Sequence, residues 1–129
     1  MTGNYLLDTN IIVAFLKGES SIVERVVSPI ELKVCSIIIG ELLYGAYNST
    51  KVEANLERVE QVKELIDSIP INDGTAAVYG RLKQHLKRNG TPIPENDVWI
   101  AAIALQNNLT LATRDRHFDK IDGLVVENW

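Results

Sequence analysis

Hydrophobic and polar positions along the chain form short apolar runs, separated by longer stretches in which apolar residues recur every three or four positions. Short runs rich in leucine, isoleucine and valine are typical of buried strands, whereas the longer spacing is typical of amphipathic helices. The predicted strands are "NYLLD", "IELKVCS", "LTLAT" and "LVVE". The segment "IPI", at residues 69–71, is either a further short strand or an extended connector.

The stretches between these runs are predicted to be helices. Residues 51–68 show the pattern best, because their apolar positions share one face and leave a charged face for solvent. Ser36 is placed to cap the helix after it, since a serine oxygen can accept from the unpaired amides of the first turn. The other predicted helices are "IIVAFLKG", "SSIVERVVS", "IIIGELLYGAYN", residues 74–89 and "DVWIAAIALQNN".

Strands that alternate with helices favour βαβ units. We therefore expect an α/β fold: a central parallel sheet of four to five strands with helices on both faces. A chain of 129 residues is the size of one ordinary domain, so residues 1–129 are predicted to form a single domain. The segments "GTPIPEND" and "RDRHFDKIDG" are predicted to be a loop and a polar turn.

Composition narrows the class of protein. With 46% hydrophobic and 23% charged residues, the chain has the balance of a soluble globular domain. It shows no secretory signal and no apolar run near the roughly 20 residues of a membrane span, so we expect a cytoplasmic protein. The net charge of -4 argues against coating of nucleic acid through bulk positive charge, but it does not exclude a nuclease. The single cysteine, Cys35, is expected to be an inert core thiol.

Acidic residues occupy positions where a parallel sheet forms its sites, which is outside the carboxyl ends of the strands. Asp8 follows the first predicted strand, and Asp115 follows "LTLAT". Asp97 opens a helix directly after a loop and can reach the same edge. Glu41 lies on a mostly apolar helix, where a carboxylate is costly to bury unless something pairs with it.

Each acid also has a purely structural interpretation. Asp8 could cap the following helix, as Asn10 could equally well. Asp97 could be favourable charge at a helix N-terminus, and Asp115 an ordinary turn residue. Glu41 could simply emerge on a solvent-facing stripe.

Taken together, the acids favour a metal site, because one fold arrangement would gather them and no comparable cluster of bases neutralises them. Mg²⁺ and Mn²⁺ prefer such hard oxygen ligands, and a cation relieves the repulsion between carboxylates. On this interpretation Asp8 binds the metal, and Asn10 is left as the expected helix cap.

Four segments in order resemble the motifs of the PIN-domain ribonucleases, and within that family the VapC-type toxins of toxin–antitoxin pairs. They are "LLDTN", "IGELLYGA", "PENDVWIAAIA" and "LATRDRHFDKIDGLVV". The resemblance implies a metal-dependent endoribonuclease that cleaves a structured RNA, commonly transfer RNA, and leaves a 5′-phosphate and a 3′-hydroxyl. It further implies a homodimer held inactive by a small VapB-type antitoxin, which can send a basic side chain into the acidic site.

The resemblance also implies roles for individual residues. The acidic Mg²⁺ or Mn²⁺ site would be formed by Asp8, Glu41, Asp97 and Asp115. Asp119, one helical turn further on, could contribute in place of Asp115. The groups that orient the ligands and waters would be Thr9, Asn10, Asn96 and Thr113.

Basic residues that could contact the RNA backbone come from two segments. The predicted helix at residues 74–89 contains Arg81, Lys83, Lys87 and Arg88, and no acid occurs between Gly74 and Pro94. Arg114 and Arg116 flank Asp115. The alternative is a solvated helix face. Of the two histidines, His85 and His117, neither has a partner that suggests a catalytic triad, and His117 is expected to be a turn residue beside an inward-packing Phe118.

The sequence leaves several alternatives open. A structure-specific DNA nuclease would use a similar acidic site, although the chain is short for the duplex-binding elements of such enzymes. A non-catalytic PIN-like binding module would keep the acids as structure only. A phosphoacceptor receiver domain would need a lysine at the end of a later strand, where "LTLAT" is followed by arginine. Tyr44, Tyr47 and Trp129 either face a partner or are core and edge aromatics.

Overall fold

Five short strands form the centre of the protein, whose computed structural model describes residues 3–129. The strands are β1 (Asn4–Leu7), β2 (Glu31–Cys35), β3 (Asp67–Ile69), β4 (Thr110–Ala112) and β5 (Val126–Glu127). They form one sheet in the order β3-β2-β1-β4-β5, and every neighbouring pair is parallel. The predicted parallel sheet of four to five strands is confirmed.

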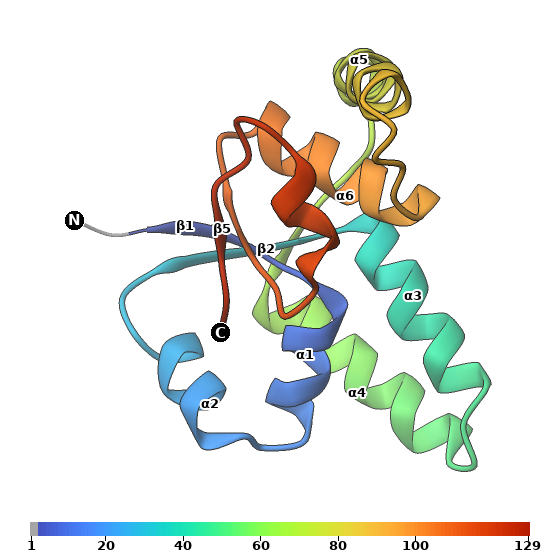
Figure 1. The fold of residues 1–129 in the computed structure, drawn as a ribbon. Helices are drawn as coiled ribbons and strands as arrows, with labels where there is room; N and C mark the ends of the chain where they lie inside the picture. The colour runs from blue at the N-terminus through green and yellow to red at the C-terminus, as the bar shows by residue number, and fades with distance from the viewer. Residues whose placement is uncertain (1–2) are drawn as a thin grey trace.

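Helices cover both faces of this sheet, as predicted, and Figure 1 shows α6 on one side and α1 and α2 on the other. The helices are α1 (Thr9–Leu16), α2 (Ser20–Val26), α3 (Ser36–Tyr47), α4 (Val52–Leu65), α5 (Asp73–Arg88), α6 (Glu95–Gln106) and the 3₁₀ helix η1 (Arg116–Lys120). Within residues 3–129, none of the helices is long and apolar enough to span a membrane.

The core follows from the apolar patterns. Leu6 and Leu7 of β1 are fully buried between the two layers of helices, and Phe118 of η1 packs inward as predicted. α6 is buried along most of its length, because residues 100–104 are all apolar and inaccessible. Cys35 is also buried, and burial raises the pKa of its thiol to about 11, which fits the expected inert core position.

Two local predictions were wrong. The helix predicted at residues 51–68 ends at Leu65, because Ile66 is extended and leads into β3. Of the two alternatives for "IPI", the connector holds for Pro70 and Ile71, which lie between β3 and α5, and only Ile69 belongs to β3. Ser36 does not cap α3: it is the first residue of the helix, the cap position is Cys35, and no side chain caps this end.

The central position of β1 creates the place for a site. From β1 the chain moves outward to β2 and β3, and then crosses to the other side of β1 to form β4 and β5. Connections therefore diverge from the carboxyl ends of β1 and β4, which is the switch point where open parallel sheets form a crevice. Leu7 lies opposite Ala112, so Asp8 and Thr113 leave the sheet side by side.

Candidate functional site

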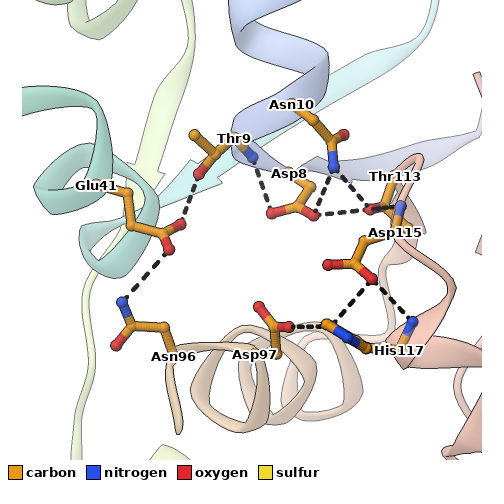
Figure 2. Close-up of polar contacts among 9 residues, drawn as sticks. All are labelled: Asp8, Thr9, Asn10, Glu41, Asn96, Asp97, Thr113, Asp115 and His117. Carbon is orange, nitrogen blue, oxygen red and sulfur yellow. Dashed lines mark hydrogen bonds and ion pairs between the residues drawn. The ribbon is translucent and has the colours of Figure 1, made fainter. Parts of the chain in front are cut away.

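Asp8 is held at the end of β1 by hydrogen bonds from three residues. Its Oδ1 accepts from the Thr9 amide at 2.8 Å, and its Oδ2 accepts from the Thr113 hydroxyl at 2.7 Å. Asn10 Nδ2 lies 3.4 Å from Oδ2, and the Asp8 side chain is almost entirely buried. Figure 2 shows this carboxylate facing the centre of a ring of polar side chains.

Asp8 also caps α1, so the prediction that Asn10 is the cap was wrong. The Asn10 side chain instead reaches across to the connection after β4. Its Nδ2 donates to Thr113 Oγ1 at 3.4 Å, and its Oδ1 accepts from the Arg114 amide at 3.2 Å. Asn10 therefore ties α1 to the segment that carries Asp115.

Glu41 enters the ring from α3 and connects two other helices. Its Oε1 accepts from the Thr9 hydroxyl at 2.6 Å, and its Oε2 accepts from Asn96 Nδ2 at 3.3 Å (Figure 2). Both hydrogen-bond donors to the Glu41 carboxylate are thus distant in the sequence, and they satisfy a charge on a helix that is mostly apolar. The solvent-stripe interpretation of Glu41 does not fit these contacts.

Asp97 and Asp115 meet at His117. Asp97 lies in the first turn of α6, and Asp115 caps η1 by accepting from the His117 amide at 2.9 Å. His117 Nδ1 lies 3.1 Å from Asp97 Oδ2 and 3.0 Å from Asp115 Oδ1. One ligand atom from each of these residues lies within 4.8 Å of the others, which is close enough to hold one metal ion.

The structure therefore brings Asp8, Glu41, Asp97 and Asp115 to one edge of the sheet, as expected, with Thr9, Asn10, Asn96 and Thr113 among them (Figure 2). Asp119 does not join them, and its carboxylate lies 3.5 Å from Arg116. Of the acids, only Asp97 and Asp115 belong to the three-residue group around His117, and Asp8 faces this group from the end of β1.

Sequence reasoning missed His117, which it placed in an ordinary turn. The only indication in the sequence is that His117 follows Asp115 by two residues. A capping carboxylate accepts from an amide two or three residues further on, so the two residues lie close together. The partner on α6 is 20 residues away and gives no local signal.

The electrostatics of the centre are those of crowded, poorly solvated carboxylates. Burial raises the pKa of Asp8, the negative charges of Asp97 and Glu41 raise it further, and the bonds from Thr113 and Thr9 partly offset this. Burial also raises the pKa of Asp97, as do Asp115 and Glu41, against the lowering effect of His117. Among residues 3–129, no lysine or arginine forms an ion pair with any of the four acids.

The predicted RNA contacts differ in availability. Arg114 is engaged within the chain: it pairs with Glu19 and donates through Nε to the Trp129 carbonyl at 3.0 Å. Lys83 pairs with Glu95 at 2.7 Å. Arg116 pairs loosely with Asp119 and is largely exposed.

The remaining three predicted contacts lie on the outer surface of α5. They are exposed, and no carboxylate of residues 3–129 pairs with them: Arg81, Lys87 and Arg88.

A parallel α/β sheet with carboxylates gathered at its switch point defines an acidic centre suited to a divalent metal. The family model described as PIN domain matches residues 5–124. Ribonuclease VapC1 of Haemophilus influenzae (strain R2866) is 33% identical over 97% of both chains. The tRNA(fMet)-specific endonuclease VapC of Shigella flexneri is 31% identical, again over 97% of both.

Solved structures agree with these sequence matches. VapBC from Salmonella typhimurium, solved bound to DNA, superposes with a TM-score of 0.90 at 30% identity over 99% of both chains. VapBC-1 from nontypeable Haemophilus influenzae gives a TM-score of 0.87 at 34% identity over 97% of both. The chain belongs to the PIN-domain family and, within it, to the group of VapC proteins.

The raised pKa of Asp8 predicts a pH dependence of stability. Folding raises this pKa, so the folded chain binds the proton more tightly than the unfolded chain. As the pH rises above the ordinary carboxyl range, Asp8 ionises and the unfolding free energy of wild type falls. Asp8→Asn cannot ionise. We expect its unfolding free energy, relative to wild type, to increase between pH 4 and pH 7 when both are measured by urea titration in chelator.

Glu64→Gln is the control, because Glu64 is exposed on α4 and forms no ion pair among the described residues. Its difference from wild type should stay constant over the same range. A constant or shrinking difference for Asp8→Asn would contradict the assigned burial cost.

Proposed function

We propose that the chain is a metal-dependent endoribonuclease, the toxin of a VapBC-type toxin–antitoxin pair, which hydrolyses a structured RNA with transfer RNA as the expected substrate. The observation that carries this is the meeting of four carboxylates from four segments, with no lysine or arginine of the described residues paired to them. The names of the VapC relatives support RNA as the substrate, and one of them is specific for a transfer RNA.

The residues present fit Mg²⁺ or Mn²⁺. Asp97 and Asp115 place oxygens close enough to share an ion, and Asp8 would complete the set from the opposite side. Burial, and beyond it the repulsion between the acids, raises the pKa values of Asp8 and Asp97, and a cation would relieve that repulsion. When bound, such an ion lowers the pKa of a bound water and stabilises negative charge on the phosphate and the departing oxygen.

The side chains around these acids would orient them for that reaction. The bonds from Thr113 and Thr9 fix both oxygens of Asp8, so this carboxylate cannot rotate away from the centre. Asn96 and Thr9 hold Glu41 in the same way. No serine–histidine or cysteine–histidine pair lies in the described centre, so the proposed attacking group is water.

The RNA backbone would cross α5. This helix packs against α6, so Arg81, Lys87 and Arg88 stand on the element next to the one that carries Asp97. Arg116 adds a positive charge beside Asp115. Phosphate contacts of this kind supply affinity and position without reading sequence.

The antitoxin would dock in a groove between α1, α3 and α4, which we call the α1–α4 groove. Its volume is about 310 Å³, and it begins at Thr9 and Glu41 of the acidic centre. It is lined mainly by apolar groups with two cations beside them: Val13, Leu16, Leu42, Gly45, Ala46, Val59, Lys17 and Arg58. An apolar segment with acidic neighbours fits this lining, and from there a basic side chain can reach the acids. We also propose that the chain is a cytoplasmic homodimer, and light scattering of the purified chain tests the dimer.

Substitution of Asp8 tests the nuclease. With total cellular RNA and Mg²⁺ or Mn²⁺, we expect wild type to cut specific RNAs and chelator to stop the reaction. The cleavage activity of Asp8→Asn should fall by more than ~10–100-fold, which is the loss that typically follows removal of a residue orienting a metal ligand. Asp115→Asn should be similarly impaired and Asp119→Asn close to wild type.

Cleavage that persists in chelator or in Asp8→Asn would exclude the metal-ribonuclease proposal. Parallel reactions with single-stranded and branched DNA test the alternative nuclease, and cutting of DNA alone would favour it. A wild-type chain that binds RNA and cuts neither nucleic acid would favour the non-catalytic module.

The cations of α5 predict the salt dependence of RNA binding. In an Asp8→Asn background, Lys87→Ala with Arg88→Ala should weaken binding and reduce the slope of log K against log salt by about 1.4–1.8, since each lost phosphate contact removes ~0.7–0.9. Lys51→Ala with Lys63→Ala, at the N-cap and in the last turn of α4, is the comparison pair and should leave the slope unchanged. An equal slope in both pairs would contradict the α5 contact.

Gly45 lines the α1–α4 groove, and a Cβ there meets no atom within 4 Å, so a longer side chain can enter the groove. We expect Gly45→Leu to reduce copurification with the cognate antitoxin by at least about tenfold, as a side chain would occupy the docking space. Gly80→Leu is the matched control, since Gly80 is equally free on α5. Equal recovery of antitoxin by both variants would place the partner elsewhere.

A further inference from the structure

A second hollow lies on the other side of Glu41, and the proposed function does not use it. It has a volume of about 530 Å³, and we call it the α3 hollow. Its lining consists of residues from α3 and the start of α6: Ser36, Ile37, Gly40, Glu41, Tyr44 and Asn96. Because Glu41 and Asn96 belong to the ring of polar contacts, the hollow opens directly from the acidic centre.

Tyr44 stands at the far end of this hollow. It follows Glu41 by three positions on α3, so the two side chains share one helix face, with Cβ atoms about 5–6 Å apart. Tyr44 is 71% exposed, and its hydroxyl makes no hydrogen bond to any residue between 3 and 129. Folding therefore leaves a large aromatic face uncovered one helical turn from a proposed metal-site residue.

Gly40 keeps the hollow open. Glycine inside a helix is less favourable than alanine, so its presence in α3 calls for a reason. Close packing is not that reason, because a Cβ at Gly40 would meet no atom within 4 Å. Any side chain there would instead project into the space between Ile37 and Tyr44, so the absence of one preserves the hollow.

The chemistry of the lining points to a neutral, flat ligand. No lysine or arginine lines the α3 hollow, and Glu41 adds negative charge, so a phosphate would be repelled there. A nucleobase has the required properties: its face can stack on an aromatic ring, and its edge can bond to the Asn96 amide or the Ser36 hydroxyl. A phosphate held at the acids would place the attached nucleotide beside this lining.

We infer that the α3 hollow binds the base of a nucleotide adjoining the cleaved phosphodiester, stacked on the ring of Tyr44. This inference rests on the proposed ribonuclease function and adds a base-binding position to it. The stacked base would be held on the opposite side of Glu41 from the α1–α4 groove.

Substitution of Tyr44 tests the stack in two assays. One measures binding of a single-stranded hexaribonucleotide containing 2-aminopurine to chains that also carry Asp8→Asn, through quenching of its fluorescence. The other measures kcat and KM on the RNA that wild type cuts. Tyr44→Ala should weaken binding and raise KM by about 5- to 150-fold, the loss expected from one base–aromatic stack. Tyr44→Phe should keep the binding affinity and the KM of wild type, because the ring and not the hydroxyl makes the contact.

Two further variants separate stacking from a general effect on α3. Tyr47→Ala removes a comparably exposed tyrosine one turn farther along the helix, outside the α3 hollow, and should behave as wild type. Gly40→Leu fills the hollow and should weaken binding as Tyr44→Ala does, while its thermal midpoint is equal to wild type or higher.

The outcomes are distinguishable. If wild type cuts no RNA, the proposed function fails. If wild type cuts RNA but Tyr44→Ala and Gly40→Leu bind and cut as wild type, only the base-binding inference is overturned. It is also overturned if Tyr44→Ala changes the sedimentation of the chain, because the ring is then a contact between two copies. Loss of antitoxin binding with RNA binding intact would overturn it as well.

Discussion

The buried hydrogen bond from the Thr113 hydroxyl to Asp8 is the contact on which the centre depends. It joins the residues that follow β1 and β4 at the point where the chain switches sides of the sheet. A buried carboxylate is costly unless hydrogen bonds satisfy it, so this bond and the one from the Thr9 amide are what permit a charge there. The Asn10 side chain and the Asp115 amide both donate to the same Thr113 hydroxyl oxygen. These bonds align α1 and η1 around the acids.

The acidic centre consequently lowers the stability of the fold, because its carboxylates are buried and close together. Burial and mutual repulsion raise the pKa values of Asp8 and Asp97, and only His117 offers a basic group to any of the four acids among the described residues. Natural sites often keep such unfavourable charge where activity needs it. Arg114, although adjacent to Asp115, does not neutralise it, because Glu19 and the Trp129 carbonyl already hold its guanidinium.

Helix α3 separates two hollows of different lining beside the acidic centre. Its buried positions, Ile38, Leu42 and Ala46, fix the helix to the core, and two glycines on its accessible faces leave space on either side of Glu41. The α1–α4 groove contains Gly45 and is apolar with cations, whereas the α3 hollow contains Gly40 and has none. A protein segment and a nucleobase can thus approach one carboxylate from opposite sides, each matched to its lining.

The sequence by itself determined the order of elements, the parallel sheet and the acids at the strand ends, because periodicity and strand-end position depend on neighbours along the chain. It did not determine that Asp8 both caps α1 and faces the acids, that His117 bridges Asp97 and Asp115, or that Arg114 is already paired. The contacts of His117 and Arg114 join residues as far as 95 positions apart. Only the tertiary structure decided them, since the free energy of a buried charge depends on which distant donors reach it, and no local pattern encodes that distance.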